Sequence, residues 1–142
     1  MNNPGKARAQ LRSRFREGSR GMPYELTRAF SFSAAHFLPE AGETHRCRAA
    51  HGHNFVVEVT VRGTPDPRTG WVMDFGDIKA EVEPLVRELD HKVLNDVPGL
   101  ENPTSERLAR WFWDRLRAGL PGLARITIAE TPASRCSYTG EE

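Results

Sequence analysis

The stretch HGHNFVVEVTVRG, residues 51–63, decides the fold class because its side chains alternate in character. One face takes two histidines and then apolar residues, namely His51, His53, Phe55, Val57, Val59 and Val61. The opposite face takes Asn54, Glu58, Thr60 and Arg62. A period of two is typical of an extended chain with one face against a core. The stretch therefore predicts a half-buried β-strand with two histidines at its entrance.

Similar alternation predicts further strands on both sides of this one. Residues 24–32 (YELTRAFSF) and 124–130 (ARITIAE) each place their large apolar side chains on one face. The stretch at 64–70 (TPDPRTG) predicts a turn by its proline, aspartate and glycine content. Short strands are also expected at 71–73 and 136–138.

Two helices are predicted between the strands. The first begins at Asp74, a typical N-cap with Asp77 three residues on, and its inner stripe is Ile78, Val82, Leu85, Val86 and Leu89. Pro84 lies inside this stripe and would cost about 3 kcal/mol in a regular helix, so we expect a kink there. The second begins near Pro103, expected at or close to its first position, and its inner face is Leu108, Trp111, Phe112 and Leu116.

Strands grouped at both ends of the chain, with two helices between them, do not form repeating βαβ units. We therefore predict an α+β fold, an antiparallel sheet with both helices packed on one face. The length of 142 residues fits one compact domain with a real core.

Charge is distributed unevenly, although the formal net charge is only +1. Residues 1–20 hold six basic residues and one acidic residue, without the apolar stretch of a secretion signal or membrane span. We interpret 1–21 as a basic, disordered extension and 22–142 as the domain; a nucleic-acid-binding arm or a transit peptide are the alternatives. Two cysteines are too few for a disulfide framework, which predicts a reduced, cytoplasmic setting. The lack of an apolar stretch and the interpretation of 1–21 as disordered predict no membrane and no nucleic-acid partner.

The pair His51 and His53 is the strongest chemical signal. Both imidazoles point from one side of a strand, and a paired neighbour would bring His36 beside them. A lone histidine would be an ordinary polar residue at a strand entrance, but this inward-facing pair favours a metal. Three neutral imidazoles leave Zn²⁺ its full charge and an open fourth position, as in catalytic zinc sites.

Two further places carry side chains suited to proton transfer. Cys47 lies between Arg46 and Arg48, whose charges favour the thiolate, so it could be a nucleophile, a general base or a fourth zinc ligand. Asp90 and His91 close the first helix, where the carboxylate could orient a histidine that carries protons. A helix-ending histidine stabilised by the helix dipole fits the same spacing equally well.

Glu130 shares a strand face with Ile126 and Ile128, and an inward carboxylate needs a partner because its desolvation is costly. An internal arginine would serve, as would the paired N–H donors of a pterin or guanine ring. Thr104 and Ser105, at the start of the second helix, are either caps or further contacts to the same ring.

These residues stand in segments that resemble the 6-pyruvoyl-tetrahydropterin synthase family. The segments are SAAHFLP (33–39), CRAAHGHN (47–54), GWVMDFGDIK (70–79), LDHKVLND (89–96), PGLENPTSE (98–106) and AET (129–131). They extend in order over residues 24–140. Among the branches of the family they most resemble the bacterial 6-carboxy-5,6,7,8-tetrahydropterin synthases of queuosine biosynthesis.

The resemblance implies a T-fold, in which subunits join their sheets into a barrel, expected here as a hexamer with active sites at subunit interfaces. It also gives each residue singled out above a role. The family's zinc ligands fall on His36, His51 and His53, its catalytic groups on Cys47, Asp90 and His91, and its pterin contacts on Glu130, Thr104 and Ser105.

By the same resemblance, the chain converts 7,8-dihydroneopterin triphosphate into 6-carboxytetrahydropterin, acetaldehyde and triphosphate. Zinc would acidify the side-chain hydroxyls of the substrate, and Cys47, tuned by His91, would move a proton at the first side-chain carbon. The alternatives are a 6-pyruvoyl-type synthase, a folate-pathway relative that typically lacks this cysteine, and a non-catalytic zinc- or purine-binding module. Cys47 and the Asp90–His91 pair have no role in such a module, which favours catalysis.

Overall fold

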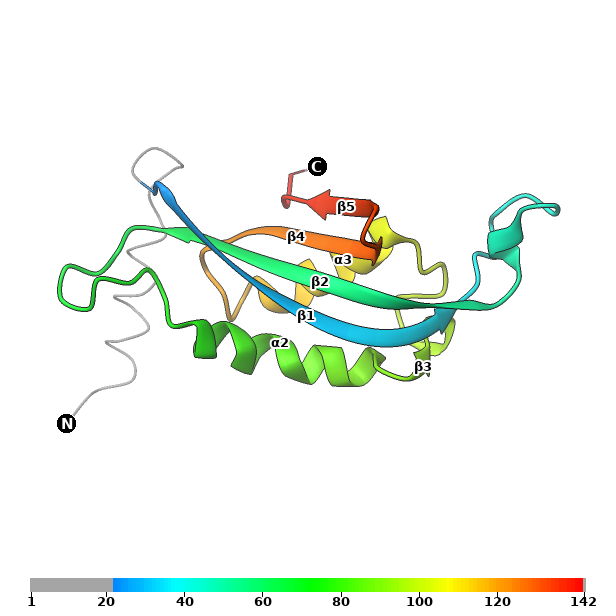
Figure 1. Ribbon diagram of the computed structural model, residues 1–142, viewed down its shortest axis with the longest axis horizontal. Coiled ribbons are helices and arrows are strands. Elements are labelled where there is room, and N and C mark those ends of the chain that lie inside the picture. The colour runs from blue at the N-terminus through cyan, green and yellow to red at the C-terminus, as the bar shows by residue number, and fades with distance from the viewer. Residues whose placement is uncertain (1–21, 142) are drawn as a thin grey trace.

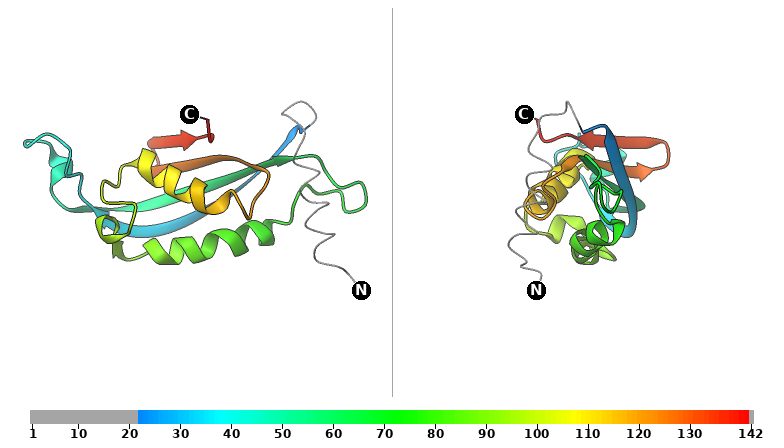
Figure 2. Two further views of the ribbon diagram at one scale, coloured as in Figure 1. Left: turned by 180° about the vertical axis from the view of Figure 1, so that it is seen from behind. Right: turned by 90° about the vertical axis from the view of Figure 1, so that its left-hand side faces the viewer.

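The computed structural model describes residues 22–141, so the extension expected at 1–21 lies outside the described residues. Figure 1 shows one curved sheet with one helix below it and the other behind it, and the views in Figure 2 place both helices on the same face. The strand order is β3-β1-β2-β4-β5. The prediction of an α+β domain with helices on one face of a sheet is confirmed. No helix in the described range is long and apolar enough to cross a membrane.

The two longest strands, β1 (Tyr24–His36) and β2 (His51–Gly63), pair antiparallel along their whole length. β4 (Leu123–Thr131) pairs with β2, and β5 (Ser134–Tyr138) pairs with β4, both antiparallel. β1 continues four residues beyond the stretch predicted from alternation, and His36 is its last residue.

Two predictions about the strands are wrong. The short strand β3 (Lys92–Val93) runs parallel to β1, so the sheet is mixed and not wholly antiparallel. A two-residue strand is too short to show alternation, so no sequence pattern indicated it. Residues 71–73 form a bend and no strand, although Val72 and Met73 are buried.

Helix α2 (Phe75–Leu89) begins as predicted, because the Asp74 carboxylate accepts a hydrogen bond from the Gly76 N–H. It continues through Pro84 and neither ends nor restarts there. Helix α3 (Ser105–Leu116) has Thr104 as its N-cap, so Pro103 precedes the cap instead of opening the helix.

The core lies between the helices and one face of the sheet. The Phe32 and Phe55 rings stack at a centroid distance of 5.2 Å, and Phe112 of α3 packs against Phe32 at 6.2 Å. Each fully buried side chain of this kind contributes roughly 1.5–3 kcal/mol to folding. This packing fixes which face of β1 and β2 turns inward, and the same face carries the histidines at the strand ends.

Candidate functional site

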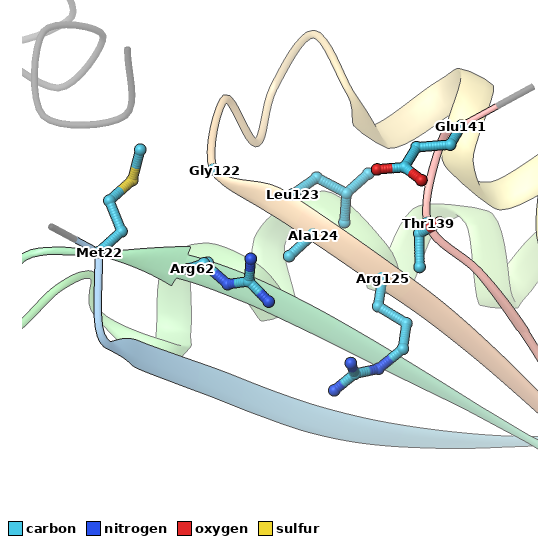
Figure 3. Close-up of a pocket in the computed structure, with 8 residues that line it drawn as sticks. All are labelled: Met22, Arg62, Gly122, Leu123, Ala124, Arg125, Thr139 and Glu141. Carbon is cyan, nitrogen blue, oxygen red and sulfur yellow. The ribbon is translucent and has the colours of Figure 1, made fainter. Parts of the chain in front are cut away.

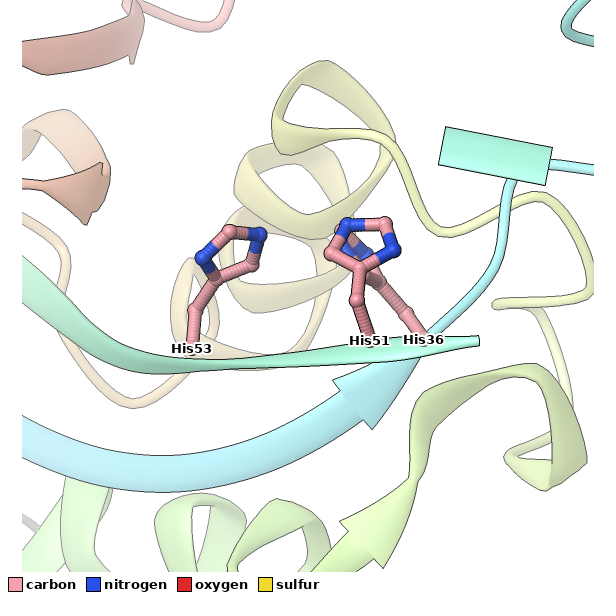
Figure 4. A group of neighbouring side chains, drawn as sticks. All are labelled: His36, His51 and His53. Atoms are coloured by element: carbon pink, nitrogen blue, oxygen red, sulfur yellow. The ribbon is translucent and has the colours of Figure 1, made fainter. Parts of the chain in front are cut away.

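Three histidines meet where the inward faces of β1 and β2 end. His36 pairs directly with His51 in the strand register, and His53 pairs with Ala34 two residue pairs further in. Figure 4 shows all three imidazoles on the same side of the sheet. One ring nitrogen from each lies within 4.8 Å of the others, so the group could hold a metal ion. The sequence-based expectation that a neighbouring strand brings His36 alongside is therefore confirmed.

Backbone carbonyl groups fix the tautomers of two of these rings. His36 Nδ1 lies 3.0 Å from the Pro103 oxygen, and His51 Nδ1 lies 2.8 Å from the Ala49 oxygen. A carbonyl oxygen only accepts hydrogen bonds, so each Nδ1 must carry the proton. In the neutral rings both Nε2 atoms are then bare acceptors, and they face each other at 3.0 Å. The two lone pairs repel each other, and a cation bound between the nitrogens would be stabilised by both.

A proton on His36 Nε2 would turn one of these two acceptors into a donor, but the surroundings of His36 disfavour its charged form. The side chain is only 1% exposed. Burial lowers the pKa of His36, the Pro103 carbonyl partly opposes this, and His51 lowers the pKa further. His36 is therefore neutral at pH 7, in the form that binds metals.

Glu130 lies beside this group at the end of β4. Its Oε2 is 4.0 Å from His53 Nε2, and its Oε1 accepts a hydrogen bond of 2.9 Å from the Ser105 hydroxyl. Within residues 22–141 no arginine pairs with it, so the internal-arginine alternative is wrong. Thr104, Ser105 and Glu130 line one shallow pocket, although the Thr104 hydroxyl is already used to cap α3. A carboxylate in a pocket with only one oxygen in a hydrogen bond can accept N–H donors from a ligand.

Cys47 lies in the loop that joins β1 to β2, in the short 3-10 turn Arg46–Arg48. Its thiol is free and half-buried, and it does not belong to the histidine group. The Leu38 N–H donates to the Cys47 carbonyl, which ties the two sides of the loop together. His45 is exposed and caps this turn, because its Nδ1 accepts a hydrogen bond from the Cys47 N–H.

Asp90 and His91 follow α2 as the sequence indicated. His91 adopts a left-handed backbone conformation (φ 58°), and its Nδ1 lies 3.0 Å from Asp90 Oδ1. The Ser33 N–H donates to the same carboxylate, and these bonds lower the pKa of Asp90, the one from Ser33 most. The His91 side chain is 81% exposed. The hydrogen bond to Asp90 orients the His91 ring, but in a single chain this ring is exposed to solvent.

The sequence reasoning missed the backbone partners of the site. The carbonyl groups of Ala49 and Pro103 orient two imidazoles, yet a carbonyl leaves no trace in residue identity. Gly52 separates His51 from His53, and a Cβ at this position would meet only the Ala34 oxygen, at an ordinary 3.5 Å. The glycine is therefore not required for space in this chain.

Comparison with known proteins identifies relatives over nearly the whole described range. The family model of 6-pyruvoyl tetrahydropterin synthase matches residues 25–141. A 6-carboxy-5,6,7,8-tetrahydropterin synthase of Synechocystis is 45% identical over 119 residues, which cover 80% of this chain and 91% of the relative. A dihydroneopterin monophosphate aldolase of Pyrococcus furiosus is 41% identical over 103 residues, covering 70% and 83%.

A solved structure agrees with these matches. The Caenorhabditis elegans 6-pyruvoyl tetrahydropterin synthase superposes with a TM-score of 0.77 at 32% identity, covering 84% of this chain and 98% of that one. The names of these three relatives describe three different reactions. Similarity alone therefore leaves the reaction to be chosen by chemistry and assay.

Proposed function

This chain belongs to the 6-pyruvoyl tetrahydropterin synthase family, and from that premise we propose that it is a zinc-dependent 6-carboxy-5,6,7,8-tetrahydropterin synthase. It would act in the cytoplasm, in queuosine biosynthesis, converting 7,8-dihydroneopterin triphosphate into 6-carboxytetrahydropterin, acetaldehyde and triphosphate. The relative from Synechocystis supports this choice within the family. The observation that carries the metal part of the proposal is the facing pair of Nε2 acceptors on His36 and His51.

The donor set fits Zn²⁺. Three imidazole nitrogens without a thiolate are the ligands of a catalytic zinc site with an open fourth position. Zinc bound by His36, His51 and His53 would supply a Lewis acid that lowers the pKa of substrate hydroxyl groups. The backbone carbonyl groups of Pro103 and Ala49 accept from Nδ1 of His36 and His51 and hold both rings in the ligating tautomer, as hydrogen-bond partners of zinc-binding histidines commonly do.

The other site residues take the roles of anchor and proton carrier. Glu130 accepts two N–H donors of the pterin ring, and Ser105 and Thr104 border the same pocket. Cys47 accepts the proton from the first side-chain carbon of the substrate. His91, oriented by Asp90 at 3.0 Å, exchanges that proton with Cys47.

A complete site needs a second copy of the chain. The His91 side chain is mostly exposed, and no contact joins the Asp90–His91 pair to the histidine group within residues 22–141. We therefore propose a homo-oligomer, a hexameric T-fold barrel, in which one subunit's pair meets the histidines of another. In this arrangement residues 22–142 form the synthase domain and 1–21 a basic extension to it.

The decisive experiment is incubation of the purified zinc-loaded protein with dihydroneopterin triphosphate, with product mass and acetaldehyde measured together. A carboxylated pterin with equimolar acetaldehyde is expected. A pyruvoyl product without acetaldehyde would reassign the chain to the synthase activity named for the C. elegans structure. Absence of turnover with zinc bound would favour the non-catalytic binding module.

A further inference from the structure

The side chain of Asn95 joins the two segments that hold His36. Asn95 lies in the 3-10 turn η2 (Leu94–Asp96), directly after β3. Its Oδ1 accepts a hydrogen bond of 3.0 Å from the Phe37 N–H. Its Nδ2 donates to the Phe37 carbonyl at 2.8 Å and to the Glu101 carbonyl at 3.3 Å.

The two hydrogen bonds between Asn95 and Phe37 extend the sheet-like pairing of β1 on its β3 side. β3 pairs with β1 only at Ala34 and Ala35, so on this edge, opposite β2, no strand lies beside the chain after Ala35. The Asn95 amide pairs with both the N–H and the carbonyl of Phe37, as a neighbouring strand would. The residue directly after His36 is thereby fixed, and the last rung of β1 is protected from fraying.

The third bond acts on the other side of His36. Glu101 lies in the loop before α3, two residues ahead of Pro103, whose carbonyl orients the His36 ring. One side chain thus restrains both the backbone that carries His36 and the loop that sets its tautomer. Both supports of this imidazole converge on Asn95.

We propose that Asn95 is a positioning residue of the metal centre. Its side chain keeps His36 Nε2 directed toward the same point as the ligand atoms of His51 and His53. The inference rests on the proposed zinc site. The role of Asn95 requires an amide, because only a group with one acceptor and two donors makes all three hydrogen bonds to Phe37 and Glu101. Aspartate has nearly the same shape but no donor when ionised, and its charge would face two carbonyl oxygens.

The test compares Asn95→Ala and Asn95→Asp with wild type in the full chain. Zn²⁺ affinity is measured by competition with a chromophoric chelator, and Co²⁺ substitution reports the coordination geometry by its visible absorption. Both variants should bind zinc about tenfold more weakly or worse, the low end of the losses seen when residues that orient a metal ligand are changed. The Phe37 amide should exchange with solvent faster in both variants.

A matched control removes a hydrogen bond of similar burial elsewhere. Thr127→Val removes the 2.8 Å bond between Thr127 and Ser137, on the opposite face of the sheet. This variant should be destabilised comparably and keep its zinc affinity. Should Asn95→Ala fail to fold, the near-isosteric Asn95→Asp carries the comparison.

The outcomes separate the two proposals. Wild type that binds zinc, beside Asn95 variants that bind it equally well with an unchanged Co²⁺ spectrum, overturns the role of Asn95 and leaves the proposed function standing. Wild type that binds no zinc overturns the zinc site and the positioning role together. Weaker binding in the Thr127→Val control as well would show a general stability effect and overturn the specific role.

Discussion

The paired strands β1 and β2 carry a polar cluster at each end, and the two clusters differ in whether their members satisfy one another. At one end Glu25 accepts hydrogen bonds from Arg62 at 2.6 Å and from Arg125 at 3.1 Å. Figure 3 shows both arginines beside this end of the sheet. At the other end, His36 and His51 turn two acceptors toward each other at 3.0 Å.

The difference distinguishes a structural cluster from a ligand site. The arginines lower the pKa of Glu25, Arg62 most, so the carboxylate is already in its favoured charged state. No further partner is needed there. The histidine end has excess acceptors and too few donors, and a metal ion bound between the imidazoles would use those free lone pairs.

His51→Ala tests this contrast most strongly. Loss of one ligand should reduce zinc affinity at least about a hundredfold, more than loss of a residue that only orients a ligand, and should abolish activity. Without metal the variant should be as stable as wild type or more so, because the facing lone pairs are gone. Thermal unfolding with and without zinc measures both effects. Wild type should gain about 2.7 kcal/mol at zinc one hundredfold above its Kd. An equal gain in the variant would contradict the site.

Cys47→Ala should retain zinc and lose catalysis. A proton carrier typically contributes about 10²–10⁴-fold to rate, so kcat should fall by that range. Metal content by atomic absorption and turnover are measured on the same sample. If zinc is lost together with activity, Cys47 is a ligand and its role as a base is wrong.

Glu130→Gln should weaken substrate binding and leave the metal in place. A hydrogen bond to a charged group contributes about 1.5–3 kcal/mol, which corresponds to a rise in KM of about tenfold or more. Glu58→Gln is the matched control, because Glu58 pairs with Arg135 on the opposite face of the sheet. The ring-anchor role fails if both variants bind substrate alike.

Glu25→Gln should show the smallest effect, confined to stability. Because the folded-state pKa of Glu25 is lowered, its contribution is present above the unfolded pKa near 4.5 and is lost as pH falls through the folded value. The side chains involved are about one-third exposed, so the difference at pH 7 should be below about 1 kcal/mol. Urea unfolding at pH 7 and at about pH 3 checks this. A difference that grows on acidification would refute the sign.

Periodicity predicted the main strands, both helices and their inner stripes, because burial of one face imposes a period of 2 or 3.6 on the sequence. It failed where elements are short or where long-range contacts override local preference. β3 spans only two residues, and β1 extends through small residues, Ser33 to Ala35, that show no strong alternation. α2 contains Pro84 within its bounds, and the kink expected there stays a prediction.

The candidate site divides in the same way. The sequence by itself determined the inward face of His51 and His53, because strand parity is a local property. Only the tertiary structure decided that His36 stands opposite His51, that the carbonyl groups of Ala49 and Pro103 leave two lone pairs face to face, and that Asn95 connects both supports of His36. These relations join residues up to 67 positions apart through backbone atoms, which every residue possesses and no sequence pattern distinguishes.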